Sequence, residues 1–272
     1  GIHASPTCVM EYSGATGWLV GEPNKGLAAM FTMMNSARLN VGLEGVGVAE
    51  AALQAATEYA GQRKQGSAPG VEGSAAIIHH PDVQRSIASM AAATQAARAI
   101  CYACGAAADL ATHATDPAVR ASAKMREDFL TPLAKGWSTD RAVDVCNTGV
   151  QIHGGMGFMG ETAAAQLYLD ARILPIYEGT NGIQAMDLIG RKLSMNNGAA
   201  AAELMEEARQ TAREARETND PRFVSIADRL EDAVDVLGEA TEWMIAKMRT
   251  ERETALYGAT AFLRLDGDVA GG

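Results

Sequence analysis

Long runs of helix-forming residues constrain the fold of this chain more than any other feature. From Gly26 onward the sequence is dominated by Ala, Leu, Met, Glu and Arg, and its apolar residues recur three and four positions apart. This spacing places the apolar side chains on one face of an α-helix, where they can pack against a neighbouring helix. We therefore expect an all-α fold from Gly26 onward, namely an antiparallel bundle of long helices joined by short connections.

Turn and capping signals divide the helical part. The Gly/Ser/Pro-rich segment 66–74 should end a first helix at residues 27–62. Proline at a first helical position, with an acidic residue beside it, marks three further helix starts, at Pro81, Pro117 and Pro221. The helix that starts at Pro117 should end near Val150. The charged sequence 205–220 should lie on a solvated face.

Composition divides the chain into three parts. Residues 1–25 are rich in Gly, Pro, Ser and Thr with short β-prone pieces, so we expect strand and turn there, too short for a stable sheet. A composition shift within residues 193–201 indicates that a second helical unit begins there. Residues 26–195 would then form the main bundle and residues 196–272 an additional, incomplete helical region. Since both ends of the sequence stop within a structural unit, we expect the chain to be a fragment.

Charge and hydropathy exclude several classes of partner. The net charge of -10 leaves no basic face for coating a nucleic acid. No run approaches the roughly 20 consecutive apolar residues needed to cross a bilayer, and no export signal stands at the N-terminus. We therefore expect a cytoplasmic protein that binds neither nucleic acid nor membranes.

Two of the four cysteines, Cys101 and Cys104, are closely spaced. A metal or redox site would need a second pair, or histidines at matching spacing, and the sequence offers neither. Because the surrounding sequence is Ala-rich and helical, core packing as small hydrophobic residues is the better interpretation. We expect no metal site.

The segment "QIHGGMGFMGE" at residues 151–161 is a candidate ligand site. Its glycines would let the backbone approach a ligand closely, and Gln151 and His153 can form hydrogen bonds. The same glycines would equally allow a tight corner between two helices. The pattern lacks the dinucleotide fingerprint GxGxxG and the strand that should precede it.

A lone carboxylate, Glu178, follows the apolar run 173–177 and precedes a Gly/Asn-rich turn. Burial disfavours the charged form of a carboxyl group, which would make this residue a useful general base near neutral pH. Alternatively, Glu178 caps a helix or pairs with a basic neighbour such as Arg172. Thr180 or Asn181 is a candidate N-cap for the helix that follows.

Arg38 and Arg63 are single basic residues in, or at the end of, a largely apolar helix. A bound phosphate would explain such an arginine, and so would a carboxylate partner within the protein. Neither arginine decides the function by itself.

Taken together, four motifs resemble the C-terminal helical domain of the acyl-CoA dehydrogenases. They are "NSAR" at 35–38, "YAGQRKQG" at 59–66, "QIHGGMGF" at 151–158 and "IYEGTNGIQ" at 176–184. They occur in the family's order and with about its spacing, over residues 18–193. The opening segment and the charged sequence after residue 195 resemble the subgroup with an extra C-terminal helical region, which includes the 3-methylmercaptopropionyl-CoA dehydrogenases.

The resemblance implies an oxidoreductase of fatty acid metabolism that converts an acyl-CoA thioester to a trans-2-enoyl-CoA. It implies that Glu178 is the base that removes the α-proton, while FAD accepts a hydride from the β-carbon. It implies substrate contacts at Asn35, Arg38 and Gly179. The FAD contacts that it implies are Arg63, Gln65, Gln151, Ile152, His153, Gly154, Gly155, Thr180, Asn181 and Gly182.

The resemblance also implies partners. It predicts an electron-transfer flavoprotein as electron acceptor and a homodimer or homotetramer that shares FAD across a subunit interface. The family's N-terminal helical domain and most of its β-domain are absent from this sequence, so we expect the chain alone to bind FAD poorly and to be inactive. Two alternatives are an acyl-CoA oxidase and a helical oligomerisation module that has lost the chemistry.

Overall fold

A computed structural model of the chain describes residues 2–218 and 220–272. Over these residues the chain is all-α, with one isolated backbone bridge between Lys64 and Ala76 and no strand, so the predicted fold class is confirmed. The first helices are α1 (Gly26–Gln62), α2 (Pro81–His113), α3 (Pro117–Pro132), α4 (Ser138–His153), α5 (Gly155–Phe158), α6 (Ala163–Ile173) and α7 (Asn181–Asp187). The later ones are α8 (Ala199–Glu217), α9 (Pro221–Thr250) and α10 (Arg252–Gly271).

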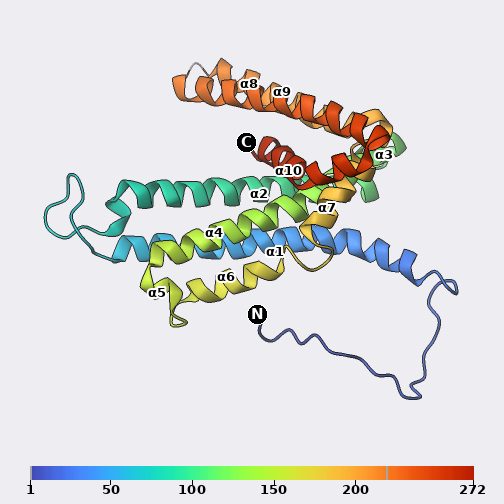
Figure 1. The fold of residues 1–272 in the computed structure, drawn as a ribbon, viewed down its shortest axis with the longest axis horizontal. Helices are drawn as coiled ribbons and strands as arrows, with labels where there is room; N and C mark the ends of the chain where they lie inside the picture. The colour runs from blue at the N-terminus through green and yellow to red at the C-terminus, as the bar shows by residue number, and fades with distance from the viewer. Residues whose placement is uncertain (1, 219) are drawn as a thin grey trace.

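The first helices form the predicted bundle, in which α1 packs against α2 and α4, and α4 packs against α6 (Figure 1). The predicted starts at Pro81, Pro117 and Pro221 are confirmed. Asp116 and Asp220 cap two of these helices, because each side chain accepts a hydrogen bond from the backbone N–H two residues later. Local sequence signals therefore set the starts of α2, α3 and α9.

The third predicted helix differs from expectation. It extends to His153 and is interrupted by a π-helical segment, Leu133–Trp137, which we call the π segment. Pro132 directly precedes the π segment, and proline inside a helix lacks an N–H and crowds the preceding turn. A locally widened turn relieves that conflict without ending the helix. The chain therefore remains helical from α3 through the π segment into α4.

Residues 2–25 form no strand, so the strand predicted there is wrong for the part of that segment that the structure describes. They run as an exposed extended chain with apolar side chains such as Val9, Trp18 and Val20 in solvent. A strand needs ladder hydrogen bonds from a neighbouring strand, and no neighbour is present among the described residues.

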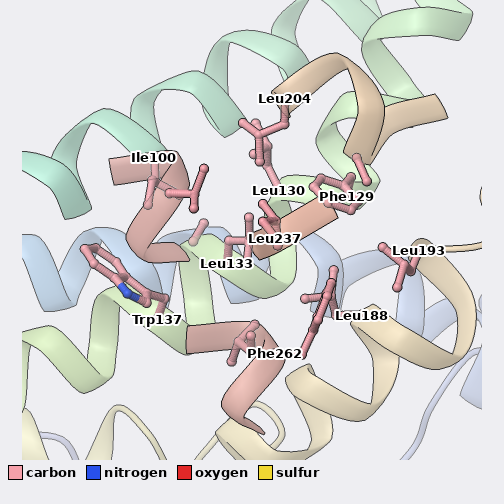
Figure 2. Close-up of a cluster of buried hydrophobic side chains, with 14 of the residues drawn as sticks. Ile100, Phe129, Leu130, Leu133, Trp137, Leu188, Leu193, Leu204, Leu237 and Phe262 are labelled. Atoms are coloured by element: carbon pink, nitrogen blue, oxygen red, sulfur yellow. The ribbon is translucent and has the colours of Figure 1, made fainter. Parts of the chain in front are cut away.

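Two clusters of buried side chains hold the molecule together. One lies among α1, α2, α4 and α6. The other joins α2, α3 and the π segment to α7 and α8–α10, and Figure 2 shows Leu133, Trp137, Leu237 and Phe262 converging within it. Helices α8–α10 are therefore continuous with the core of the bundle.

Helix α10 makes the closest of these contacts. A Cβ atom on Gly267 would lie 2.3 Å from Cγ of the Trp137 ring, and one on Gly136 would lie 2.7 Å from Leu263 Cδ2. The Trp137 indole also donates to Asp268 Oδ1 at 2.8 Å. Only glycine allows the π segment and α10 to approach this closely.

Cys101 and Cys104 belong to the larger core cluster, as predicted for packing residues. Burial raises the pKa of the Cys101 thiol to about 12 and that of Cys104 to about 11, which keeps both protonated. On the outside, α8 and α9 are linked by ion pairs such as Arg216 with Asp228, and much of α8 is exposed, as its charged sequence predicted. No helix in the described residues is long and apolar enough to span a membrane.

Candidate functional site

The segment between α6 and α7 reverses the chain sharply at the predicted base. Glu178 has φ 56° and Gly179 has φ 87°, so two successive residues occupy the left-handed region. For a residue with a side chain this conformation costs about 1–2 kcal/mol, so surrounding contacts must hold it in place. We call residues 176–180 the base loop.

Contacts from two other elements hold the base loop. Lys135 of the π segment is fully buried, and its ammonium group donates to the Gly179 carbonyl oxygen at 2.7 Å and to Asn181 Oδ1 at 2.9 Å. The Tyr177 hydroxyl donates to the Glu44 carboxylate on α1. Burial lowers the pKa of Lys135 to about 8, although nearby Asp140 favours its charged form.

Asn181 completes this support. Its amide nitrogen contacts the Gly136 carbonyl at 2.9 Å, Thr139 Oγ1 at 2.9 Å and Asp140 Oδ1 at 2.7 Å. The polar atoms of this buried side chain are therefore engaged within the chain. The predicted N-cap of α7 is Thr180, whose hydroxyl accepts from the Ile183 N–H at 3.4 Å.

Arg38 and Gly179, two of the predicted substrate contacts, lie close together. A Cβ atom on Gly179 would lie 3.8 Å from Arg38 Nη2 and 3.0 Å from Gln184 Nε2, so a side chain at this position would be crowded. Arg38 is 5% exposed and pairs with Asp187 at 3.5 Å. Its Nε and the Gln184 Oε1 have no partner among the described residues. Arg38 therefore has the carboxylate partner that one explanation expected, and its Nε–H is not used within the described residues. Asn35, one turn before it on α1, is half-buried.

Glu178 itself is half-buried. The ion pairs of the described residues include none with Glu178, and Arg172 is exposed, so the alternative pairing with Arg172 is not found. The carboxylate oxygens of Glu178 are therefore partly shielded from water and have no ion-pairing cation among the described residues. This is the arrangement that a general base needs.

A second group of predicted residues lines a separate hollow of about 370 Å³. Its lining comprises Tyr59, Arg63, Gln65, Ile77, Ile152, His153, Gly154, Gly155, Met156 and Met159. The His153 ring stacks on Tyr59 with centroids 4.5 Å apart, and His153 Nδ1 lies 2.7 Å from the Gly149 carbonyl oxygen. Gly154 has φ 61° and forms a corner between α4 and α5, so the segment is both a corner and the wall of a hollow.

The two groups lie far apart. Arg38 and Arg63 are separated by 25 residues of helical rise along α1, or about 37 Å. Figure 1 shows α5 beside the C-terminal end of α1, away from α7. Gln151 and Gly182 are exposed, and Gln151 does not line the hollow. The structure thus gathers most predicted residues into two sites, one around Glu178 and one around His153.

Sequence reasoning missed Lys135, the residue that contacts the base loop most directly. A signal was present, since "FLTPLAKGW" at residues 129–137 places one charged residue inside an apolar stretch. A lysine is almost never fully buried unless its ammonium group finds partners. That rule would have singled out Lys135, although not the atoms that it contacts.

Two family models match the chain. The model described as "Acyl-CoA dehydrogenase, C-terminal domain" matches residues 24–194, and "Acetyl-CoA dehydrogenase C-terminal like" matches residues 204–272. A 3-methylmercaptopropionyl-CoA dehydrogenase of Ruegeria pomeroyi is 48% identical over all of this chain and 46% of its own length. A butyryl-CoA dehydrogenase of Syntrophomonas wolfei is 36% identical over 73% of this chain and 34% of its own. The chain thus spans less than half the length of these relatives.

Solved structures share the fold. An acyl-CoA dehydrogenase from Bacillus anthracis, complexed with FAD, has a TM-score of 0.71 and 25% identity over 92% of this chain and 43% of its own. Caenorhabditis elegans ACDH-11, in complex with C11-CoA, has a TM-score of 0.75 and 20% identity over 92% of this chain and 41% of its own.

Proposed function

Since the chain belongs to the acyl-CoA dehydrogenase family, a family of oxidoreductases, we propose that it is the C-terminal part of a flavin-dependent acyl-CoA dehydrogenase. Its substrate would be an acyl-CoA thioester and its product a trans-2-enoyl-CoA. The relatives named above act on 3-methylmercaptopropionyl-CoA and butyryl-CoA by name, which supports a thioester substrate without selecting its acyl group.

The proposal depends on Glu178 as the base that removes the α-proton. A thioester makes its α-proton acidic enough for a carboxylate to remove, and Glu178 is half-buried with no ion pair in the described part of the chain. Gly179 leaves open the space where a side chain would crowd Arg38 and Gln184, and Asn35 and Arg38 lie on the adjoining helix. FAD, when bound, supplies the acceptor for the hydride that leaves the β-carbon.

The residues of the hollow fit the adenosine diphosphate part of FAD. Arg63 is exposed at the lining and offers a cation for the diphosphate group. Cβ atoms on Gly154 or Gly155 would meet nothing within 4 Å, so the backbone is open to a ligand there. Gln65, Ile152 and His153 complete this proposed contact surface, and Gln151 would contact the ligand from outside the hollow.

We infer that each FAD contacts two subunits. Arg38, beside the base loop, and Arg63, at the hollow, are separated by about 37 Å of helical rise along α1, which is longer than an extended dinucleotide. Thr180, Asn181 and Gly182 of one subunit would then lie near the flavin end, while the hollow of another subunit binds the adenosine end. This proposal requires a homodimer or homotetramer. Residues 1–25 would be the last piece of a preceding β-domain, and an electron-transfer flavoprotein would accept the electrons.

The test is Glu178→Gln in the full-length, FAD-loaded enzyme. The amide keeps the size of the side chain but cannot take a proton, so substrate-dependent bleaching of the flavin should slow by about 1,000-fold or more while FAD stays bound. Glu242→Gln, which changes an exposed glutamate on α9, is the matched control and should bleach normally. Normal bleaching by Glu178→Gln would refute the assignment of the base.

The same preparation separates the alternatives. A colourless full-length protein without a flavin spectrum would support an assembly module that has lost the chemistry. Rapid oxygen uptake after anaerobic reduction would instead identify an acyl-CoA oxidase.

A further inference from the structure

The base loop rests on a lysine that lies entirely inside the protein. Lys135 is 0% exposed and forms no ion pair with any residue that the structure describes. Burying an ammonium group without an anion bonded to it is unfavourable unless strong acceptors surround it. Its acceptors here are the Gly179 carbonyl oxygen at 2.7 Å and Asn181 Oδ1 at 2.9 Å, directly beyond Glu178 in sequence.

The backbone of the base loop explains why those acceptors face inward. With both Glu178 and Gly179 in the left-handed region, the chain turns so that the Gly179 carbonyl meets the buried ammonium. A buried carbonyl must find a donor, and Gln184 Nε2 supplies only a long second contact of 3.3 Å. Lys135 provides the short, charge-assisted bond that keeps this turn in one conformation.

The backbone of Lys135 is itself held by α10, which packs against the residues that follow the lysine in sequence. The lysine lies on the π segment, whose neighbouring residues Gly136 and Trp137 are packed tightly against Leu263 and Gly267 of α10. Its charged surroundings come from three elements: Asp140 on α4 and Glu178 in the base loop favour the ammonium form, while Arg38 on α1 opposes it. The lysine therefore links a rigid part of the core to the residue proposed as base.

We propose that Lys135 is a positioning residue for proton abstraction. By holding the Gly179 carbonyl and the Asn181 side chain, it keeps the Glu178 carboxylate directed at the α-carbon of the substrate. This inference rests on the proposed function. It goes beyond that function because Lys135 is bonded to Gly179 and Asn181 and would act only through the position of Glu178.

The experiment uses the full-length, FAD-loaded enzyme with Lys135→Met, which removes the charge and both donors at similar length. Lys135→Gln, which keeps one amide donor, is the second variant in case the first does not fold. The matched control is Lys192→Met, because Lys192 is also largely buried but pairs with Asp128 at 3.4 Å, away from the base loop. Each enzyme is mixed with excess acyl-CoA, unlabelled or deuterated at the α-carbon, and flavin bleaching is followed in a single turnover.

We expect bleaching to slow by about 100-fold in Lys135→Met, the size of effect that a small misplacement of a reacting group produces. Lys135→Gln should be intermediate, the α-deuterium isotope effect should rise in both, and KM should change little. The control should keep the wild-type rate and isotope effect. A rise in the isotope effect would support positioning, because a mere loss of folded enzyme leaves it unchanged.

Two results would overturn the inference. One is a wild-type rate in either Lys135 variant, and the other is a slower rate with an unchanged isotope effect, which would indicate a purely structural lysine. A wild-type enzyme that no acyl-CoA bleaches would instead refute the proposed function, so the two failures are distinguishable.

Discussion

Substituting Gly267 by alanine tests the contact between α10 and the π segment. The added Cβ would lie 2.3 Å from two atoms of the Trp137 ring, whereas non-bonded carbon atoms prefer about 3.5 Å or more. The helix or the ring must therefore move by roughly 1.2 Å. Such a movement would also stretch the 2.8 Å bond from the Trp137 indole to Asp268.

The expected loss of stability follows from these terms. Overpacking in a core costs about 1–3 kcal/mol, and weakening a hydrogen bond costs about 1 kcal/mol. The helix preference of alanine over glycine offsets about 1 kcal/mol of this. The net destabilisation of Gly267→Ala is therefore about 2 kcal/mol, which for a chain of this size lowers Tm by roughly 4–8 °C.

Thermal unfolding followed by circular dichroism and by tryptophan fluorescence measures this change. The matched control is Gly47→Ala, since a Cβ on that exposed helical glycine would meet nothing within 4 Å. The control should gain about 0.5–1 kcal/mol. If Gly267→Ala is as stable as Gly47→Ala, the close approach of α10 to Trp137 is wrong.

Three further substitutions test other parts of the structure. Burial raises the pKa of the Asp266 carboxyl to about 7, so the folded state retains a proton that the unfolded chain releases near pH 4. Stability should therefore fall between about pH 4 and 7, and Asp266→Asn should remove that fall in urea titrations; parallel curves for the two proteins would contradict this. Thr180→Ala removes the N-cap of α7 and should cost about 0.5–1 kcal/mol by urea unfolding, while an unchanged midpoint would exclude a capping role. Gly157→Ala places a Cβ 2.4 Å from the Val150 carbonyl oxygen and should cost about 1–3 kcal/mol, with a neutral effect arguing against the tight corner after α4.

Helix boundaries and the all-α class could be predicted because their causes are local. A capping aspartate followed by proline acts on its own turn, so Asp116 with Pro117 and Asp220 with Pro221 were sufficient signals. The strand expected in residues 1–25 is not found in residues 2–25, the part that the structure describes, for the opposite reason. A strand is stabilised by a partner, and β-prone residues cannot supply that partner themselves.

The candidate site was partly predictable. Motif order selected Glu178 as the candidate base, and the structure places the predicted Arg63, His153 and Gly154 around one hollow. The contact from Lys135 to Gly179 spans 44 positions and depends on a π segment that no local periodicity signals. Contacts of this kind arise from tertiary packing, so one sequence read by itself could not reveal the support of the base loop.

The position of α10 also has a consequence for the order in which the molecule is made. The ribosome completes α1, the π segment and the base loop well before residues 252–271. Until those residues emerge, α10 cannot pack against Gly136 and Trp137. The turn that carries Lys135 then lacks its contacts with Leu263 and Gly267. A nascent chain halted at residue 251 would contain the proposed base, the base loop and Lys135. It would lack α10, which packs against the π segment that carries the lysine. The packing behind Lys135 is thus completed late in biosynthesis, although the sequence around Glu178 is translated much earlier.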